Sequence, residues 1–205
     1  MPTTPIDRRC LLLGEGDDEL HVFNKILQSI SLDGVFQVEK YGGKDSLRLY
    51  LSGLKNRVGF SDLESVIITR DADTDADSAF QSVTDALLFY DFACPAMRGA
   101  LSGGIPAIGV YIIPGGKIKG MLEDVCLSSV DDDPTIPCVD VFLNCLQEKS
   151  IAPSNTSKAR AQAFLASRDR PDLRLGEAAE KGYWNLDHAV FDGLKTFLME
   201  AAARP

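Results

Sequence analysis

Acidic side chains in this 205-residue sequence fall at three places where they could bind a metal ion. Glu15 follows one apolar run, Asp71 and Asp73 follow another, and Glu123-Asp124 comes soon after a third. Residues two apart in an extended segment project to the same side, so Asp71 and Asp73 can converge on one ion. Carboxylate oxygens suit Mg²⁺ or Mn²⁺, which take one or two carboxylates and keep water positions for a phosphate.

A divalent ion is also the natural counter-charge for these groups, because uncompensated neighbouring carboxylates repel one another and raise each other's pKa. The sequence therefore predicts a Mg²⁺ (or Mn²⁺) site with Glu15, Asp71, Asp73 and Glu123 as ligands. Structural alternatives remain open for two of them. Glu15 could interact only with the N-terminal dipole of the following helix, and Glu123 could cap or charge the helix after Gly120.

These acidic positions lie at the ends of predicted strands. Apolar runs at residues 10–13, 35–41, 65–69 and 107–113 alternate with segments of helical periodicity. Strands that alternate with helices indicate a parallel sheet. We therefore expect an α/β, Rossmann-like sheet of about four mainly parallel strands flanked by helices. In such open sheets, ligands bind beyond the carboxyl ends of the strands.

Beyond Gly120 the pattern changes to helices, which we expect near residues 121–130, 138–148, 158–167 and 189–202. No repeat, low-complexity tract or flexible linker separates them from the rest. We therefore expect residues 1–130 to form the α/β core. Residues 131–205 are expected to form a C-terminal helical extension packed on the same domain.

Composition excludes several classes of function. A net charge of -9 repels nucleic acid phosphates unless local basic patches intervene, which argues against non-specific DNA coating. The five cysteines form no C-x-x-C pair and the two histidines are far apart, which argues against structural zinc. No apolar run is long enough to span a membrane, and no signal peptide is recognisable. We expect a cytoplasmic protein with reduced thiols and no membrane partner.

Two segments resemble the motifs of Toprim domains. Residues 12–19 (LLGEGDDE) are similar to their glutamate motif, and residues 66–73 (VIITRDAD) are similar to their paired-aspartate motif. Toprim domains occur in topoisomerases, primases, small ribonuclease-like proteins and OLD-family nucleases. The resemblance implies that Glu15 assists phosphoryl transfer and that Asp71 and Asp73 hold Mg²⁺. Most of the chain also resembles an uncharacterised prokaryotic family of stand-alone Toprim-like proteins.

The leading hypothesis is a Mg²⁺-dependent phosphodiester hydrolase or nucleotidyl-transfer protein that acts on nucleic acid, with Glu15, Asp71 and Asp73 as catalytic residues. Lys117 and Lys119 follow a glycine-rich turn beside the acidic site and are candidate phosphate-binding residues. No G-x-x-x-x-G-K-[ST] stretch is present, so ATP hydrolysis by this chain is not expected.

Two alternatives remain open. One is a non-catalytic Toprim-like interaction module that binds a partner protein such as an ATPase, which the acidic net charge favours. The other is a haloacid-dehalogenase-like phosphatase, in which the first aspartate of a D-x-D motif is the nucleophile. A basic groove formed by Lys117, Lys119, Lys158 and Arg160 beside the carboxylates would favour an enzyme that acts on nucleic acid.

Overall fold

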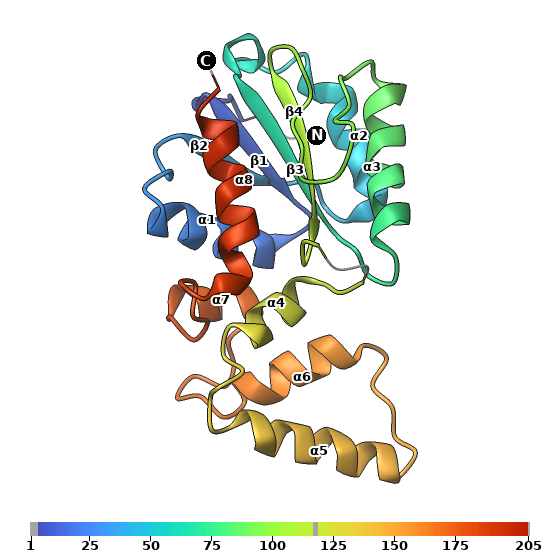
Figure 1. The fold of residues 1–205 in the computed structure, drawn as a ribbon, viewed down its shortest axis with the longest axis vertical. Coiled ribbons are helices and arrows are strands. Elements are labelled where there is room, and N and C mark those ends of the chain that lie inside the picture. Colours follow the sequence, from blue (N-terminus) through green and yellow to red (C-terminus); the bar gives the residue numbers. More distant parts are fainter. Residues whose placement is uncertain (1–3, 117–118, 205) are drawn as a thin grey trace.

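The computed structural model describes residues 4–116 and 119–204, which form an α/β fold (Figure 1). In chain order the elements are β1 (Cys10–Gly14), α1 (Asp17–Ser29), β2 (Phe36–Lys40), α2 (Leu47–Leu54), β3 (Ser65–Asp71), α3 (Ala76–Phe89), β4 (Ala107–Ile113), α4 (Leu122–Ser128), α5 (Ile136–Glu148), α6 (Thr156–Leu165), α7 (Leu175–Glu180) and α8 (Asp192–Ala202). Short 3-10 helices lie at Lys44–Ser46, Phe60–Asp62 and Ala189–Phe191.

The strands form one parallel, four-stranded sheet in the order β2-β1-β3-β4. Helices α1 and α8 cover one face, and α2 and α3 cover the other (Figure 1). Strands buried on both faces need apolar residues at successive positions, which explains the continuous apolar runs of β1, β3 and β4. The predicted fold class is therefore confirmed.

Helix α8 returns from the end of the chain to the sheet. Its Phe197 ring stacks on Tyr111 of β4, with ring centroids 5.6 Å apart. The helix can approach this closely because residue 109 is glycine. A Cβ there would lie 2.6 Å from the Phe197 ring and 2.7 Å from Ile67 Cδ1. Gly109 therefore sets the distance between helix and sheet.

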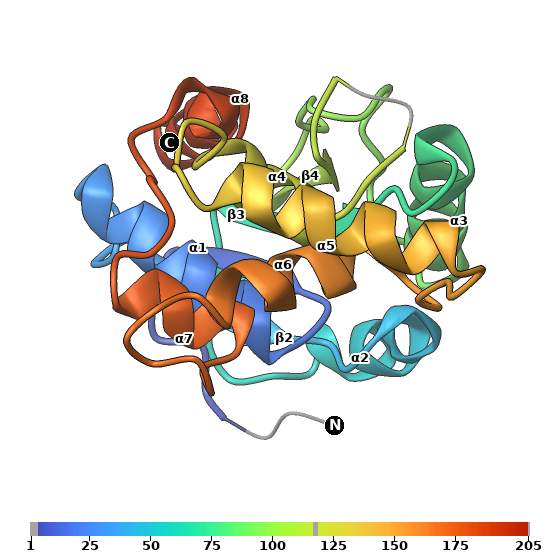
Figure 2. The ribbon, with the colours of Figure 1, turned by 90° about the horizontal axis from the view of Figure 1, so that it is seen from below.

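Helices α4, α5 and α6 lie beyond the carboxyl ends of the strands, and Figure 2 shows them from that side (Figures 1 and 2). The loop before α5 is tied to the end of α6 because Arg168 donates to both carboxylate oxygens of Asp133, at 3.0 and 3.1 Å. Buried Trp184 stacks on Phe164 and donates to the Leu175 carbonyl at 2.9 Å. These contacts join α5, α6 and α7 to one another.

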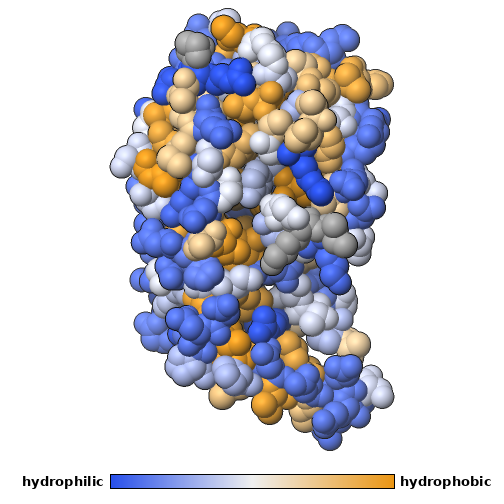
Figure 3. All heavy atoms as spheres, in the orientation of Figure 1, coloured by the Kyte–Doolittle hydropathy of each residue, from blue (hydrophilic) through white to orange (hydrophobic). Residues whose placement is uncertain are grey.

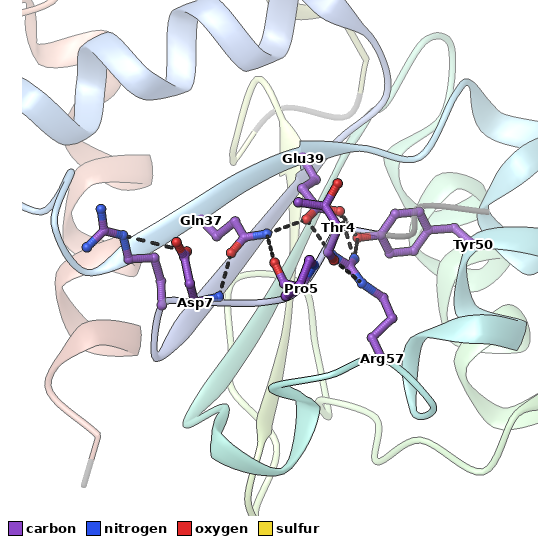
Figure 4. A network of polar contacts seen from close by, with 8 residues as sticks. Thr4, Pro5, Asp7, Gln37, Glu39, Tyr50 and Arg57 are labelled. Atoms are coloured by element: carbon purple, nitrogen blue, oxygen red, sulfur yellow. Dashed lines mark hydrogen bonds and ion pairs between the residues drawn. The ribbon is translucent and has the colours of Figure 1, made fainter.

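A polar network fixes β2, at the edge of the sheet (Figure 4). Both guanidinium ends of Arg57 donate to the Glu39 carboxylate, at 2.6 and 2.8 Å, and Tyr50 donates to it at 2.6 Å. Arg57 also donates to the Thr4 carbonyl. Burial opposes ionisation of Glu39, but hydrogen bonds from Arg57, Tyr50 and Gln37 hold its pKa below the usual value.

The structure differs from the sequence-based expectation mainly in α7, which was not predicted. Its six residues make fewer than two helical turns, too few to show a periodic pattern. In the part of the chain that the structure describes, no helix has the length and apolar character needed to cross a membrane. All five cysteines are free thiols.

Candidate active site

Glu15 is the first residue after β1 and is held from both its backbone and its side chain. Its backbone carbonyl accepts hydrogen bonds from the N–H groups of Gly42 and Gly43, at 3.0 and 2.9 Å. Its carboxylate Oε1 accepts from the Asp71 N–H at 3.3 Å and lies 3.4 Å from Arg70 Nε. The ends of β1, β2 and β3 therefore meet at this residue.

The neighbouring acidic residues of α1 have structural partners. Glu19 accepts from the Gly16 N–H at 3.0 Å, and Asp18 accepts from the Gly176 N–H at 2.8 Å, at the start of α7. Gly14 lets α1 begin so close to the strand, since a Cβ there would lie 2.6 Å from Glu19 Cβ. These contacts place α1 and α7 beside Glu15.

Asp71 and Asp73 lie at the end of β3 and in the turn that follows it. Asp71 Oδ1 accepts a hydrogen bond from the Leu122 N–H at 3.1 Å. Asp73 has φ 49°, and its carbonyl accepts from the Gly120 N–H at 2.9 Å. The pair therefore does not project from one extended segment, as the spacing had predicted, because the chain has already turned at Asp73. Both residues still line the same cavity.

Glu123 lies in the first turn of α4, with its side chain 13% exposed and its Oε1 3.9 Å from Lys158 Nζ. The adjacent Asp124 has the capping role. It accepts from the Met121 N–H at 2.9 Å and from Ser157 Oγ at 2.6 Å, which connects α4 with α6. Glu123 therefore does not cap the helix and lines the cavity instead.

These residues surround one cavity of about 520 Å³ at the carboxyl edge of the sheet. Among the described residues, its charged lining comprises seven carboxylates and three lysines: Glu15, Asp17, Asp18, Glu19, Asp71, Asp73, Glu123, Lys40, Lys44 and Lys158. We call it the acidic cavity. All four predicted metal ligands thus line one cavity, although Glu15 and Glu123 are 108 residues apart in the sequence.

Burial and mutual repulsion dominate the electrostatics of the acidic cavity. Burial raises the pKa of Asp71 well above its usual value, and the charges of Glu19, Glu15 and Glu123 raise it further. Burial also raises the pKa of Glu15, which the nearby Arg70 guanidinium partly opposes. The pKa of Glu123 is raised by burial as well. These carboxyl groups would be stabilised in their charged form by a bound cation.

The donor set of the acidic cavity fits a hydrated Mg²⁺ or Mn²⁺ ion. Within residues 4–116 and 119–204, no three His, Cys, Asp or Glu side chains converge closely enough to enclose a metal on their own. Mg²⁺ does not require such an enclosure, since it keeps several waters and takes one or two protein carboxylates. Glu15 and Asp71 meet at this edge because the Asp71 N–H donates to the Glu15 carboxylate.

The structure describes only one of the two predicted phosphate-binding lysines. Lys119 is exposed and is not among the residues that line the acidic cavity, and Lys117 lies outside the described residues. Lys158 does line the cavity. Arg160 instead pairs with Asp140 of α5, at 2.8 Å.

Sequence reasoning missed three cations that lie next to the carboxylates: Lys40, which pairs with Asp17, Lys44 and Arg70. Lys44 lines the acidic cavity, and Arg70 contacts Glu15 directly. Both follow or end a strand, Lys44 after β2 and Arg70 as the penultimate residue of β3. That location at the carboxyl edge was the available signal.

The fold and the site define an α/β protein with a single parallel sheet and an acidic cavity at its carboxyl edge, where proteins of this class bind their ligands. Residues 9–202 match the model of a family described as protein of unknown function (DUF3226), and the chain belongs to this family. The match extends from the start of β1 to the end of α8. No curated protein and no solved structure matches the chain.

Proposed function

We propose that this protein is a Mg²⁺- or Mn²⁺-dependent phosphodiester hydrolase of the Toprim kind that acts on nucleic acid. The observation that carries the proposal is the direct link between Glu15 and the Asp71 backbone, at the edge of a cavity with seven carboxylates. The residues linked are those that the Toprim resemblance assigns to phosphoryl transfer and to metal binding. We place this activity in the cytoplasm, where the five free thiols stay reduced.

Asp71 is the proposed direct metal ligand, and Asp73, Glu123 and Glu15 are proposed to complete the site directly or through the waters that the ion keeps, with Glu15 alternatively as the base. A bound divalent ion supplies charge neutralisation and polarises a phosphate oxygen. The Leu122 N–H orients the Asp71 carboxylate through Oδ1. Because this hydrogen bond already restricts the Asp71 side chain, less conformational entropy is lost when the carboxylate binds the metal ion.

Glu15 suits the role of general base because burial raises its pKa, which strengthens it as a proton acceptor. Arg70, with Nε 3.4 Å from Oε1, favours the ionised form that can accept a proton. In the proposed step Glu15 takes a proton from water as the water oxygen bonds to phosphorus. The phosphorus–oxygen ester bond breaks, and the leaving oxygen takes a proton from solvent.

Titration calorimetry with Mg²⁺ and Mn²⁺, followed by cleavage assays on DNA and RNA with the same samples, tests the proposal. An Asp71→Asn, Asp73→Asn double variant should lose metal binding and cleavage. Glu15→Gln should keep its fold and lose cleavage by about 10²- to 10⁴-fold, the contribution typical of a general base. Asp62→Asn is the matched control, since Asp62 is exposed and lies just before β3, at the opposite edge of the sheet. It should leave both properties unchanged.

A second candidate is a non-catalytic module that binds a partner protein such as an ATPase. An apolar groove of about 730 Å³ between α5 and α6 favours it, next to exposed Phe142 and Val141. Figure 3 shows hydrophobic atoms among the polar ones at the end of the molecule formed by these helices. Folded wild-type protein that neither binds metal at millimolar concentration nor cleaves nucleic acid would overturn the hydrolase and favour this module.

A further inference from the structure

A second cavity, of about 470 Å³, lies beside the acidic one between α2 and α3. Its lining includes the charged side chains of Lys44, Arg48, Arg70, Asp45 and Asp85 and the amide of Gln81. We call it the basic cavity. Lys44 lines both cavities, and Arg70 of the basic cavity contacts Glu15 of the acidic one. The two cavities therefore adjoin along Lys44 and Arg70.

Arg70 is buried, with 8% of its surface exposed, yet the protein occupies few of its hydrogen-bond donors. Its Nε lies 3.4 Å from Glu15 Oε1, and its Nη1 makes a long hydrogen bond of 3.5 Å to the Lys44 carbonyl. Among the described residues, no hydrogen bond from Nη2 is present. A guanidinium has five N–H donors, so most of the donors of Arg70 are available to a ligand in the basic cavity.

Among the described residues, the lining of the basic cavity carries three cations and two carboxylates, whereas carboxylates outnumber cations in the acidic cavity. One of its carboxylates, Asp85, already accepts a hydrogen bond from Gln81 at 2.7 Å. Lys44 and Arg48 are exposed at the mouth, and Arg48 lies over the exposed ring of Phe89, 5.4 Å from its centroid. The basic cavity thus offers cations to the backbone of a single strand, and the exposed Phe89 ring lies outside its lining, against Arg48.

We propose that the basic cavity binds a backbone phosphate of a nucleic acid strand, next to the phosphate that is hydrolysed at the acidic cavity. This inference rests on the proposed function for the position of the cleaved bond. Arg70 donates to the anchored phosphate with its planar fork, and Lys44 lies between the two phosphates. The carboxylates of the acidic cavity repel an anionic strand, and a phosphate bound by these cations offsets that repulsion. The expected substrate is therefore a strand with a phosphate on each side of the cleaved position, not a mononucleotide.

Fluorescence anisotropy with a labelled single-stranded oligonucleotide about 12 nucleotides long tests this, in Ca²⁺ so that binding is measured without Mg²⁺-dependent cleavage. The main variant is Lys44→Gln, Arg48→Gln, because both side chains are exposed and their loss should leave the fold intact. Its Kd should rise about tenfold or more, and the salt dependence should fall by about 1.4 in log–log slope, for two lost contacts on a single strand. Arg70→Lys, which keeps the charge and removes the fork, should also weaken binding.

The matched control is Lys149→Gln, Lys181→Gln, which removes the same charge from exposed positions at the ends of α5 and α7. Its Kd should stay within about twofold of wild type, since distant charges are screened. An equal loss in both double variants would overturn the inference. A mononucleotide such as dTMP that competes as well as the unlabelled strand would overturn the assignment to a strand.

Failure of this inference is distinguishable from failure of the proposed function. Lys44→Gln, Arg48→Gln should still bind Mg²⁺ in calorimetry, because neither residue is a proposed metal ligand. Cleavage that depends on Asp71, together with strand binding unchanged by Lys44→Gln, Arg48→Gln, would overturn the inference alone. Strand binding that depends on Lys44 and Arg48, in a protein that neither binds metal nor cleaves, would overturn the hydrolase alone.

Discussion

The Asp71 carboxylate accepts a hydrogen bond from the backbone N–H of Leu122, with 3.1 Å between Oδ1 and N. This contact joins the end of β3 to the start of α4, across 51 residues of sequence. It also brings Glu123 beside Asp71, because Glu123 follows Leu122 in the first turn of the helix. The same hydrogen bond therefore organises the acidic cavity and holds the helices beyond the sheet against its carboxyl edge.

Replacement of Asp71 by asparagine should stabilise the metal-free protein while it abolishes cleavage. Asparagine can still accept from Leu122, but it removes a partly buried charge that Glu15, Glu19 and Glu123 repel. We expect a gain of about 1 kcal/mol, or ~2–4 °C in Tm, in thermal unfolding with EDTA at neutral pH. Asp62→Asn should change stability by less than about 0.5 kcal/mol. A loss of stability in Asp71→Asn would contradict the repulsion argument.

The stability of the metal-free protein should depend on pH through the same carboxyl groups. The folded state raises the pKa of Asp71, Glu15 and Glu123, so it holds protons that the unfolded chain has released. Their stabilising contribution is full below the unfolded values near about 4 and is lost as pH rises through the folded values.

Urea unfolding at several pH values between weakly acidic and neutral measures this effect. In EDTA, the free energy of unfolding should fall as the pH rises through this range. Millimolar Mg²⁺ should reverse part of the fall, because the ion binds the deprotonated carboxylates. In the Asp71→Asn variant, the free energy of unfolding should depend less steeply on pH than in wild type. An equal slope in the two proteins would show that Asp71 does not contribute to the pH dependence.

Removal of Arg57 should be among the most destabilising changes at the edge of the sheet. Arg57→Met would leave the Glu39 carboxylate half-buried without its ionic partner, at a cost of about 3 kcal/mol in urea unfolding. The pKa of Glu39 is lowered in the folded protein, so its contribution is present above the unfolded value and lost as pH falls through the folded one. Arg57→Met should lose this acid sensitivity. Arg8→Met, at an exposed position, serves as the control and should be nearly neutral.

Gly109→Ala tests the close packing of α8 on the sheet. The new methyl group would overlap the Phe197 ring and Ile67, so the helix must shift away from β4. Overpacking of this kind costs about 1–3 kcal/mol, measurable by thermal or urea unfolding. Gly34→Ala is the matched control, because a Cβ at Gly34 has no atom within 4 Å and the substitution should be neutral or slightly stabilising. Similar effects of the two substitutions would contradict the packing argument.

The parallel sheet and the edge at which its acidic residues gather follow from the local sequence pattern. Strands buried on both faces require continuous apolar runs, and β1, β3 and β4 each contain such a run. The carboxyl ends of parallel strands share one edge of the sheet, so acidic residues just after those runs had to gather there. The sequence pattern alone therefore predicts that Glu15 and Asp71 lie near each other.

The contacts of each charged side chain depend instead on how the elements pack in three dimensions. Asp18, in the first turn of α1, accepts from the N–H of Gly176 at the start of α7, 158 residues away. Lys44 and Arg70 came to lie between two cavities because β2 and β3 flank β1, an order that periodicity does not encode. The physical reason is that periodicity reports which face of an element is buried, through local spacing alone. Hydrogen bonds, ion pairs and shifted pKa values depend on distances between segments, which are defined only once the elements have packed.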